Sequence, residues 1–162
     1  MADPHWTSYV GMITGIAGAI MGFVSIRKVK QIKALDLRIE LKRAVANINS
    51  DFKKLLEQMI EEDKSRMAVS SAIGMLKSGN TKKWKDALEA DQAAAKDLEK
   101  ELPNEKANYD HLDPKGLEDK LIEAHKIHRK ISNLSEKYHE AMKWDNEQRR
   151  NIREDMRARI KG

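Results

Sequence analysis

Residues 37–59, LRIELKRAVANINSDFKKLLEQM, carry the packing pattern on which the fold depends. Apolar side chains recur there at spacings of four, four, three, four, three and four residues. This is close to a heptad period, so it predicts one face of a helix that packs as a coiled-coil seam. No proline interrupts the stretch, and we expect one helix over about 27–78. The seam residues are Leu37, Leu41, Val45, Ile48, Phe52, Leu55 and Met59.

Residues 6–26, upstream of this seam, form an uncharged apolar run. At a rise of about 1.5 Å per residue, a helix of that length measures roughly 31 Å, close to the hydrocarbon thickness of a bilayer. Basic residues concentrate on the cytoplasmic side of a membrane span and contact anionic headgroups there. We therefore expect a short tail at 1–5, a single transmembrane helix at 6–26 with the amino terminus outside, and a cytoplasmic helical domain at 27–162. The basic anchor at the membrane surface would be Arg27, Lys28, Lys30 and Lys33.

Glycines within the apolar run share one side of the expected helix. They lie four, three and four residues apart, at Gly11, Gly15, Gly18 and Gly22. Lipid tails are as apolar as leucine, so membrane helices associate through close backbone approach, which small residues permit. The stripe therefore predicts a glycine zipper through which copies of the chain form a homo-oligomer in the bilayer.

The first helix is expected to continue past the seam and to end near residue 78. Asp63, Lys64 and Arg66 crowd the turns that follow Met59, so we expect the apolar register to shift there. Ser78-Gly79-Asn80 is then expected to end the first helix, because glycine adopts the left-handed C-terminal turn at low cost.

Capping residues and prolines set the other boundaries. Thr81 suits the N-cap of a second helix, over about 81–102, which Pro103 follows. Asp113-Pro114 is typical of a helix start and predicts a third helix over about 114–158, with a polar interval from Asp145 to Asn151. The predicted fold is therefore all-α: an N-terminal transmembrane helix followed by an elongated antiparallel helical bundle or coiled coil.

Catalytic motifs are absent from the sequence. It holds no phosphate-binding glycine loop, no HExxH, no nucleophile elbow and no cysteine. Glu136 and His139 form a single Glu-x-x-His, whereas a di-metal helical bundle needs two such motifs and two further glutamates. We therefore expect no enzyme activity, no metal site and no cofactor.

The net charge of +5 is modest for 162 residues and does not predict nucleic-acid binding. Basic residues gather near the C-terminus, but acidic residues interleave with them, which is typical of a solvated helix face with ion pairs. Contact with an acidic protein, nucleic acid or lipid is the alternative. The basic residues are Arg149, Arg150, Arg153, Arg157, Arg159 and Lys161.

These patterns favour a non-enzymatic, membrane-anchored coiled-coil scaffold. It would self-associate through the glycine face and present its cytoplasmic helical bundle to a protein partner. A first alternative is a pore-forming effector, controlled by the cytoplasmic helices, in which Thr14 and Ser25 border the pore-lining glycines. A second is a soluble helical oligomer that buries residues 6–26 between subunits.

Overall fold

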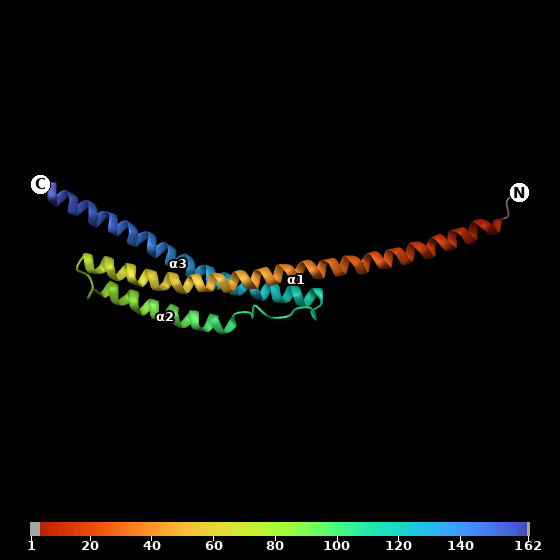
Figure 1. Cartoon of the computed structure of the whole chain (residues 1–162), viewed down its shortest axis with the longest axis horizontal. Coiled ribbons are helices and arrows are strands. Elements are labelled where there is room, and N and C mark those ends of the chain that lie inside the picture. The colour runs from red at the N-terminus through yellow and green to blue at the C-terminus, as the bar shows by residue number, and fades with distance from the viewer. Residues whose placement is uncertain (1–3, 162) are drawn as a thin grey trace. The chain divides into compact units, whose positions relative to one another are not determined.

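The computed structural model describes the backbone of residues 4–161 and the side chains of residues 21–160 other than Val24, Ile26 and Lys30. The described residues form three helices and no strand, which confirms the all-α class. These are α1 (Pro4–Ala72), α2 (Gly79–Glu101) and α3 (Pro114–Lys161) (Figure 1).

α1 ends earlier than the expected residue 78, and its terminating glycine is Gly74 rather than Gly79. Gly74 has a φ of 71°, and the Met75 amide donates to the Ser70 carbonyl oxygen at 2.7 Å. A glycine with left-handed backbone angles, followed by an amide that donates back to a carbonyl oxygen in the last turn, is the Schellman motif. It provides hydrogen-bond donors for the last free carbonyl groups of a helix. Gly74 and Gly79 both lie near the expected boundary, and only the backbone conformation distinguishes them.

α2 begins two residues before the expected cap, because Ser78 rather than Thr81 fills that role. The Thr81 amide donates to Ser78 Oγ at 3.2 Å. α3 starts at Pro114, where Asp113 Oδ1 accepts from the Gly116 amide at 2.8 Å. Each side chain pairs an amide that the first turn of a helix leaves free.

The chain divides into two compact units, the first combining Met1–Leu41 with Asn108–Leu121 and the second combining Lys42–Ala107 with Ile122–Gly162. In the first unit, Arg38 Nη2 donates to the carbonyl oxygens of Asp110 at 2.7 Å and Leu112 at 3.3 Å. These bonds hold the segment before α3 against α1. Lys33 Nζ lies 2.9 Å from Glu118 Oε1, so the start of α3 also contacts α1.

In the second unit, α2 returns antiparallel along α1, as Figure 1 shows. Thr81 Oγ1, at the start of α2, donates to Ser70 Oγ near the end of α1 at 3.4 Å. At the opposite end, Asn49 Nδ2 donates to the Pro103 carbonyl oxygen at 3.2 Å. These contacts fix both ends of the helix pair.

The part of α3 in the second unit contacts both other helices. Ser135 Oγ donates to Gln58 Oε1 of α1 at 2.6 Å, and Tyr138 Oη donates to Asp91 Oδ2 of α2 at 2.8 Å. The Tyr138 ring also meets the Trp84 ring edge-on, with centroids 6.0 Å apart. Buried apolar side chains in this unit come from all three helices, among them Leu55 of α1, Leu98 of α2 and Ile131 of α3.

In the part of the chain that the structure describes, no helix carries an apolar segment long enough to cross a bilayer. Most of the 6–26 run, with Gly11, Gly15 and Gly18, lies outside the residues whose side chains are described. The transmembrane helix and the glycine zipper stay predictions.

Candidate functional site

The predicted seam residues lie almost entirely inside the chain's own core. Leu37 is half-buried, and the other six are at most 4% exposed. A partner helix could reach these side chains only by displacing the chain's own helices, so a docking partner would use other surfaces. The six are Leu41, Val45, Ile48, Phe52, Leu55 and Met59.

The predicted membrane-surface residues whose side chains the structure describes are exposed to solvent. Arg27 and Lys28 are exposed, and the Arg27 guanidinium lies 5.0 Å from the centre of the Phe23 ring. A Cβ atom added at Gly22 would meet no heavy atom within 4 Å, so this position of the glycine stripe is uncovered. The Lys30 side chain lies outside the described residues, and Lys33 pairs with Glu118 as described above.

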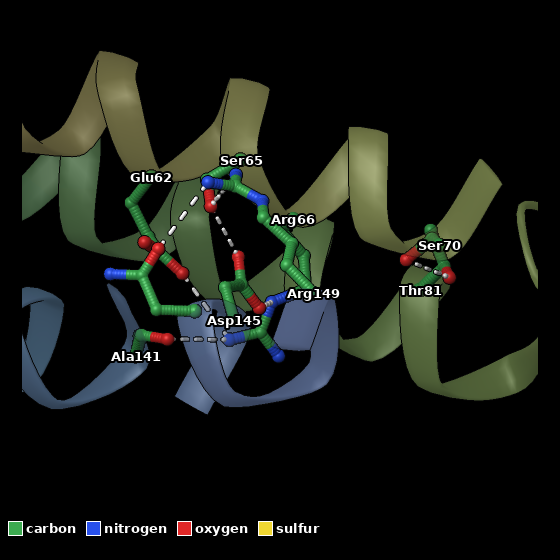
Figure 2. Close-up of polar contacts among 9 residues, drawn as sticks. Glu62, Ser65, Arg66, Ser70, Thr81, Ala141, Asp145 and Arg149 are labelled. Carbon is green, nitrogen blue, oxygen red and sulfur yellow. Dashed lines mark hydrogen bonds and ion pairs between the residues drawn. The ribbon is translucent and has the colours of Figure 1, made fainter. Parts of the chain in front are cut away.

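A buried polar cluster joins α1 to α3 in the second unit (Figure 2). Glu62, Ser65 and Arg66 come from α1, while Asp145 and Arg149 come from α3. Glu62 and Asp145 are both 0% exposed. We call these five residues the ionic cluster.

Arg66 is the central cation of the ionic cluster. Its Nε lies 2.8 Å from Asp145 Oδ1, and its Nη2 donates to Glu62 Oε1 at 3.2 Å. The guanidinium carbon also lies 4.6 Å from the Trp84 ring centre and 4.4 Å from the Trp144 ring centre. Partly desolvated cation–π contacts of this kind add to the ion pairs in holding a guanidinium.

Ser65 completes the connection between the helices. Its Oγ donates to Asp145 Oδ2 at 2.8 Å and accepts a hydrogen bond from Arg149 Nη2 at 2.5 Å. The Asp145 carboxylate therefore has a partner on each oxygen. Both partners come from α1, so the contact specifies which turn of α3 lies against which turn of α1.

Glu62 is the electrostatically perturbed member of the cluster. Burial raises its pKa from 4.5 to about 7; the charge of Asp145 adds to the rise and Arg66 opposes it. Its Oε2 atom is buried and has no hydrogen-bond partner. Glu62 therefore holds a proton at mildly acidic pH.

Protonation of Glu62 makes the stability of the second unit depend on pH. Between about pH 4.5 and pH 7 the folded chain holds this proton, whereas the unfolded chain has released it. The contribution of Glu62 to the free energy of unfolding is therefore complete below about pH 4.5 and is lost as the pH rises to about 7 and above. A shift of this size corresponds to roughly 3 kcal/mol. We expect Glu62→Gln to remove this pH dependence and to raise the free energy of unfolding at about pH 8, measured by chemical denaturation across this pH range.

The neighbouring substitution Glu61→Gln is the matched control, because Glu61 is exposed. It should leave the pH profile of wild-type stability unchanged. Equal profiles for wild type and Glu62→Gln would contradict the assignment of the proton to Glu62.

The sequence interpretation missed the ionic cluster and was wrong about the register. Continuing the seam spacing from Met59 by three, four and three residues reaches Glu62, Arg66 and Val69. Glu62 and Val69 are buried, so the register continues without a shift. The signal is the unbroken heptad spacing, although charged residues occupy two of its positions. Asp145, expected in a polar interval of the third helix, is buried as well.

The Glu-x-x-His pair lies elsewhere, in a groove of about 420 Å³ between α1 and α3. Glu136 and His139 line this groove together with His128, whose Nε2 is 3.3 Å from Asp51 Oδ2. Among the described side chains, no group of three or more histidines and carboxylates is arranged to hold a metal ion.

No family model matches this chain, and neither a curated protein nor a solved structure matches it.

Proposed function

We propose that this chain is a non-enzymatic, membrane-anchored helical scaffold that self-associates through its glycine-rich face and presents cytoplasmic helices to a protein partner. The observation that supports this best is the extent of α1, which runs as one helix from Pro4 to Ala72. It contains both the apolar run at 6–26 and the six buried seam residues. Anchor and folded core therefore belong to the same helix, without a linker.

We interpret the second unit as the elongated antiparallel bundle of this scaffold. This is supported by contacts from α3 to both other helices, through Ser135 with Gln58 and Tyr138 with Asp91. A bundle that is closed by its own apolar residues is a stable platform, and its outer helix faces remain available to a partner.

Self-association is supported by exposed aliphatic side chains that continue the glycine spacing. Counting onward from Gly22 in alternating steps of three and four reaches Ser25, Val29, Ile32, the charged Asp36 and then Ile39. Val29, Ile32 and Ile39 are each at least 43% exposed in the single chain. Burial of such residues against a second copy would stabilise an oligomer by about 25 cal/mol per Å² of apolar surface removed from water.

The orientation of the scaffold follows from its basic anchor. We place the amino terminus outside and residues 27–162 in the cytoplasm, since Arg27 and Lys28 are exposed directly after the apolar run. At this position they would contact anionic headgroups of the inner leaflet, at about 1 kcal/mol per residue.

The test is cross-linking of the full chain in membranes, with a double variant Gly15→Leu, Gly18→Leu. We expect carbonate-resistant membrane retention for wild type and variant alike, and loss of cross-linked oligomers in the variant only, because leucine prevents close backbone approach. Ala17→Leu is the control, since it adds the same side chain away from the glycine stripe.

Oligomers that persist in the double variant would contradict association through the glycine face. Extraction of the wild type by carbonate would contradict the anchor and favour the soluble oligomer. Ion leakage from vesicles that contain the inserted wild type would favour the pore-forming alternative, because a scaffold does not open the bilayer.

A further inference from the structure

The C-terminal end of α3 carries an apolar stripe that becomes exposed toward the end of the helix. The face of α3 that contacts α1 through Asp145 and Arg149 continues as Ile152, Met156 and Ile160, at spacings of three, four and four residues. Ile152 is half-buried, while Met156 is 56% and Ile160 is 85% exposed. Figure 1 shows this end of α3 diverging from the neighbouring parts of α1 and α2. Met156 and Ile160 are therefore open to solvent.

Arginines border this stripe. At about 100° per residue, Arg153 lies beside the stripe on one side of the helix and Arg159 on the other. Arg157 lies beyond Arg153, and Asp155 lies beyond Arg159. Glu154 lies on the opposite side, where its Oε1 is 3.9 Å from Arg150 Nε. All residues from 153 to 160 are exposed. Basic and apolar side chains thus share one side of the helix end.

The distribution of charge indicates which kind of surface binds this end of α3. A second copy would bring several arginines together around the shared apolar stripe, where like charges repel. Nucleic acid would pair with the arginines but would leave Met156 and Ile160 in water. An anionic bilayer accepts both groups, because aliphatic side chains enter the boundary between headgroups and acyl chains while arginines contact phosphates.

We propose that residues 150–160 form a basic amphipathic helix that binds an anionic lipid surface, with Ile152, Met156 and Ile160 inserted and Arg153, Arg157 and Arg159 on the headgroups. This contact is separate from the anchor at 6–26 and does not depend on it. It would give the folded second unit its own reversible membrane contact, sensitive to lipid charge and to salt.

The absence of cysteine from the chain allows a site-specific test. The full chain, in phosphatidylcholine nanodiscs that occupy the apolar run, is labelled with an environment-sensitive fluorophore at Met156→Cys or, as the matched control, at Ala158→Cys on the opposite side of the helix. Vesicles with or without phosphatidylserine are then added. We expect a blue shift and protection from an aqueous quencher at position 156 only, with phosphatidylserine only, and reversal at high salt.

A second variant keeps the test independent of folding. Arg153 and Arg157 are exposed, so Arg153→Gln with Arg157→Gln should leave the circular dichroism spectrum unchanged. It should weaken vesicle affinity roughly thirtyfold, since each arginine near an anionic surface contributes about fivefold.

Equal responses to neutral and anionic vesicles, or none to either, would overturn the proposal. The proposal would also be overturned if the fluorophore at position 156 responded to nucleic acid alone, or to a higher protein concentration without vesicles. Failure of the chain to enter nanodiscs would contradict the anchor at 6–26, but the label would still report vesicle binding by the C-terminal helix.

Discussion

Replacement of Arg66 by methionine is expected to lower the free energy of unfolding by about 3–5 kcal/mol at neutral pH. Arg66 is the cation that contacts both buried carboxyl groups, Glu62 at 3.2 Å and Asp145 at 2.8 Å. Without it, these groups lose their shared partner, and a negative charge on either of them becomes more costly away from water. The contacts with the Trp84 and Trp144 rings are lost as well. Chemical denaturation of the full chain in mild detergent, followed by circular dichroism, measures the change.

The pH dependence of this loss separates it from a packing defect. The destabilisation should be smaller near pH 5 than near pH 8, because protonation of Glu62 removes one of the two like charges. Arg150→Met is the control, since Arg150 is 66% exposed and its pairing with Glu154 spans 3.9 Å. Its cost should stay at about 1 kcal/mol or less. Similar losses for Arg66→Met and Arg150→Met would contradict a central role for Arg66.

Replacement of Leu55 by alanine is expected to cost about 2–5 kcal/mol. Leu55 is 0% exposed, at the centre of the seam on α1. The substitution removes its apolar contacts and leaves a cavity that the surrounding helices fill only partly. Thermal or chemical denaturation measures the loss, and the far-UV spectrum before denaturation should stay helical.

The next residue along the chain provides the control. Leu56 has the same side chain and the same helix propensity but is 38% exposed. Leu56→Ala should therefore cost about 1 kcal/mol or less. A larger loss for Leu56→Ala than for Leu55→Ala would show that the core lies on the other side of α1.

Much of the helical organisation could be predicted because its causes are local. Apolar spacing from Leu37 to Met59 identifies the face that the structure buries, and Asp113-Pro114 marks the start of α3. The end of α1 could not be predicted to the residue, since both Gly74 and Gly79 can terminate a helix. The hydrogen bond from the Met75 amide to the Ser70 carbonyl oxygen shows which one does.

The helical class, the buried face of α1 from Leu37 to Met59 and the start of α3 could be predicted from the sequence, because side-chain periodicity and capping act over a few residues. The burial of Glu62 and Asp145, with the half-buried Arg66 paired to both, depends on how α1 packs against α3. Ser65 and Asp145 are 80 positions apart, yet they share a hydrogen bond. A charged residue at a seam position is buried only if another helix supplies its partner, and that depends on which turns of α1 and α3 meet.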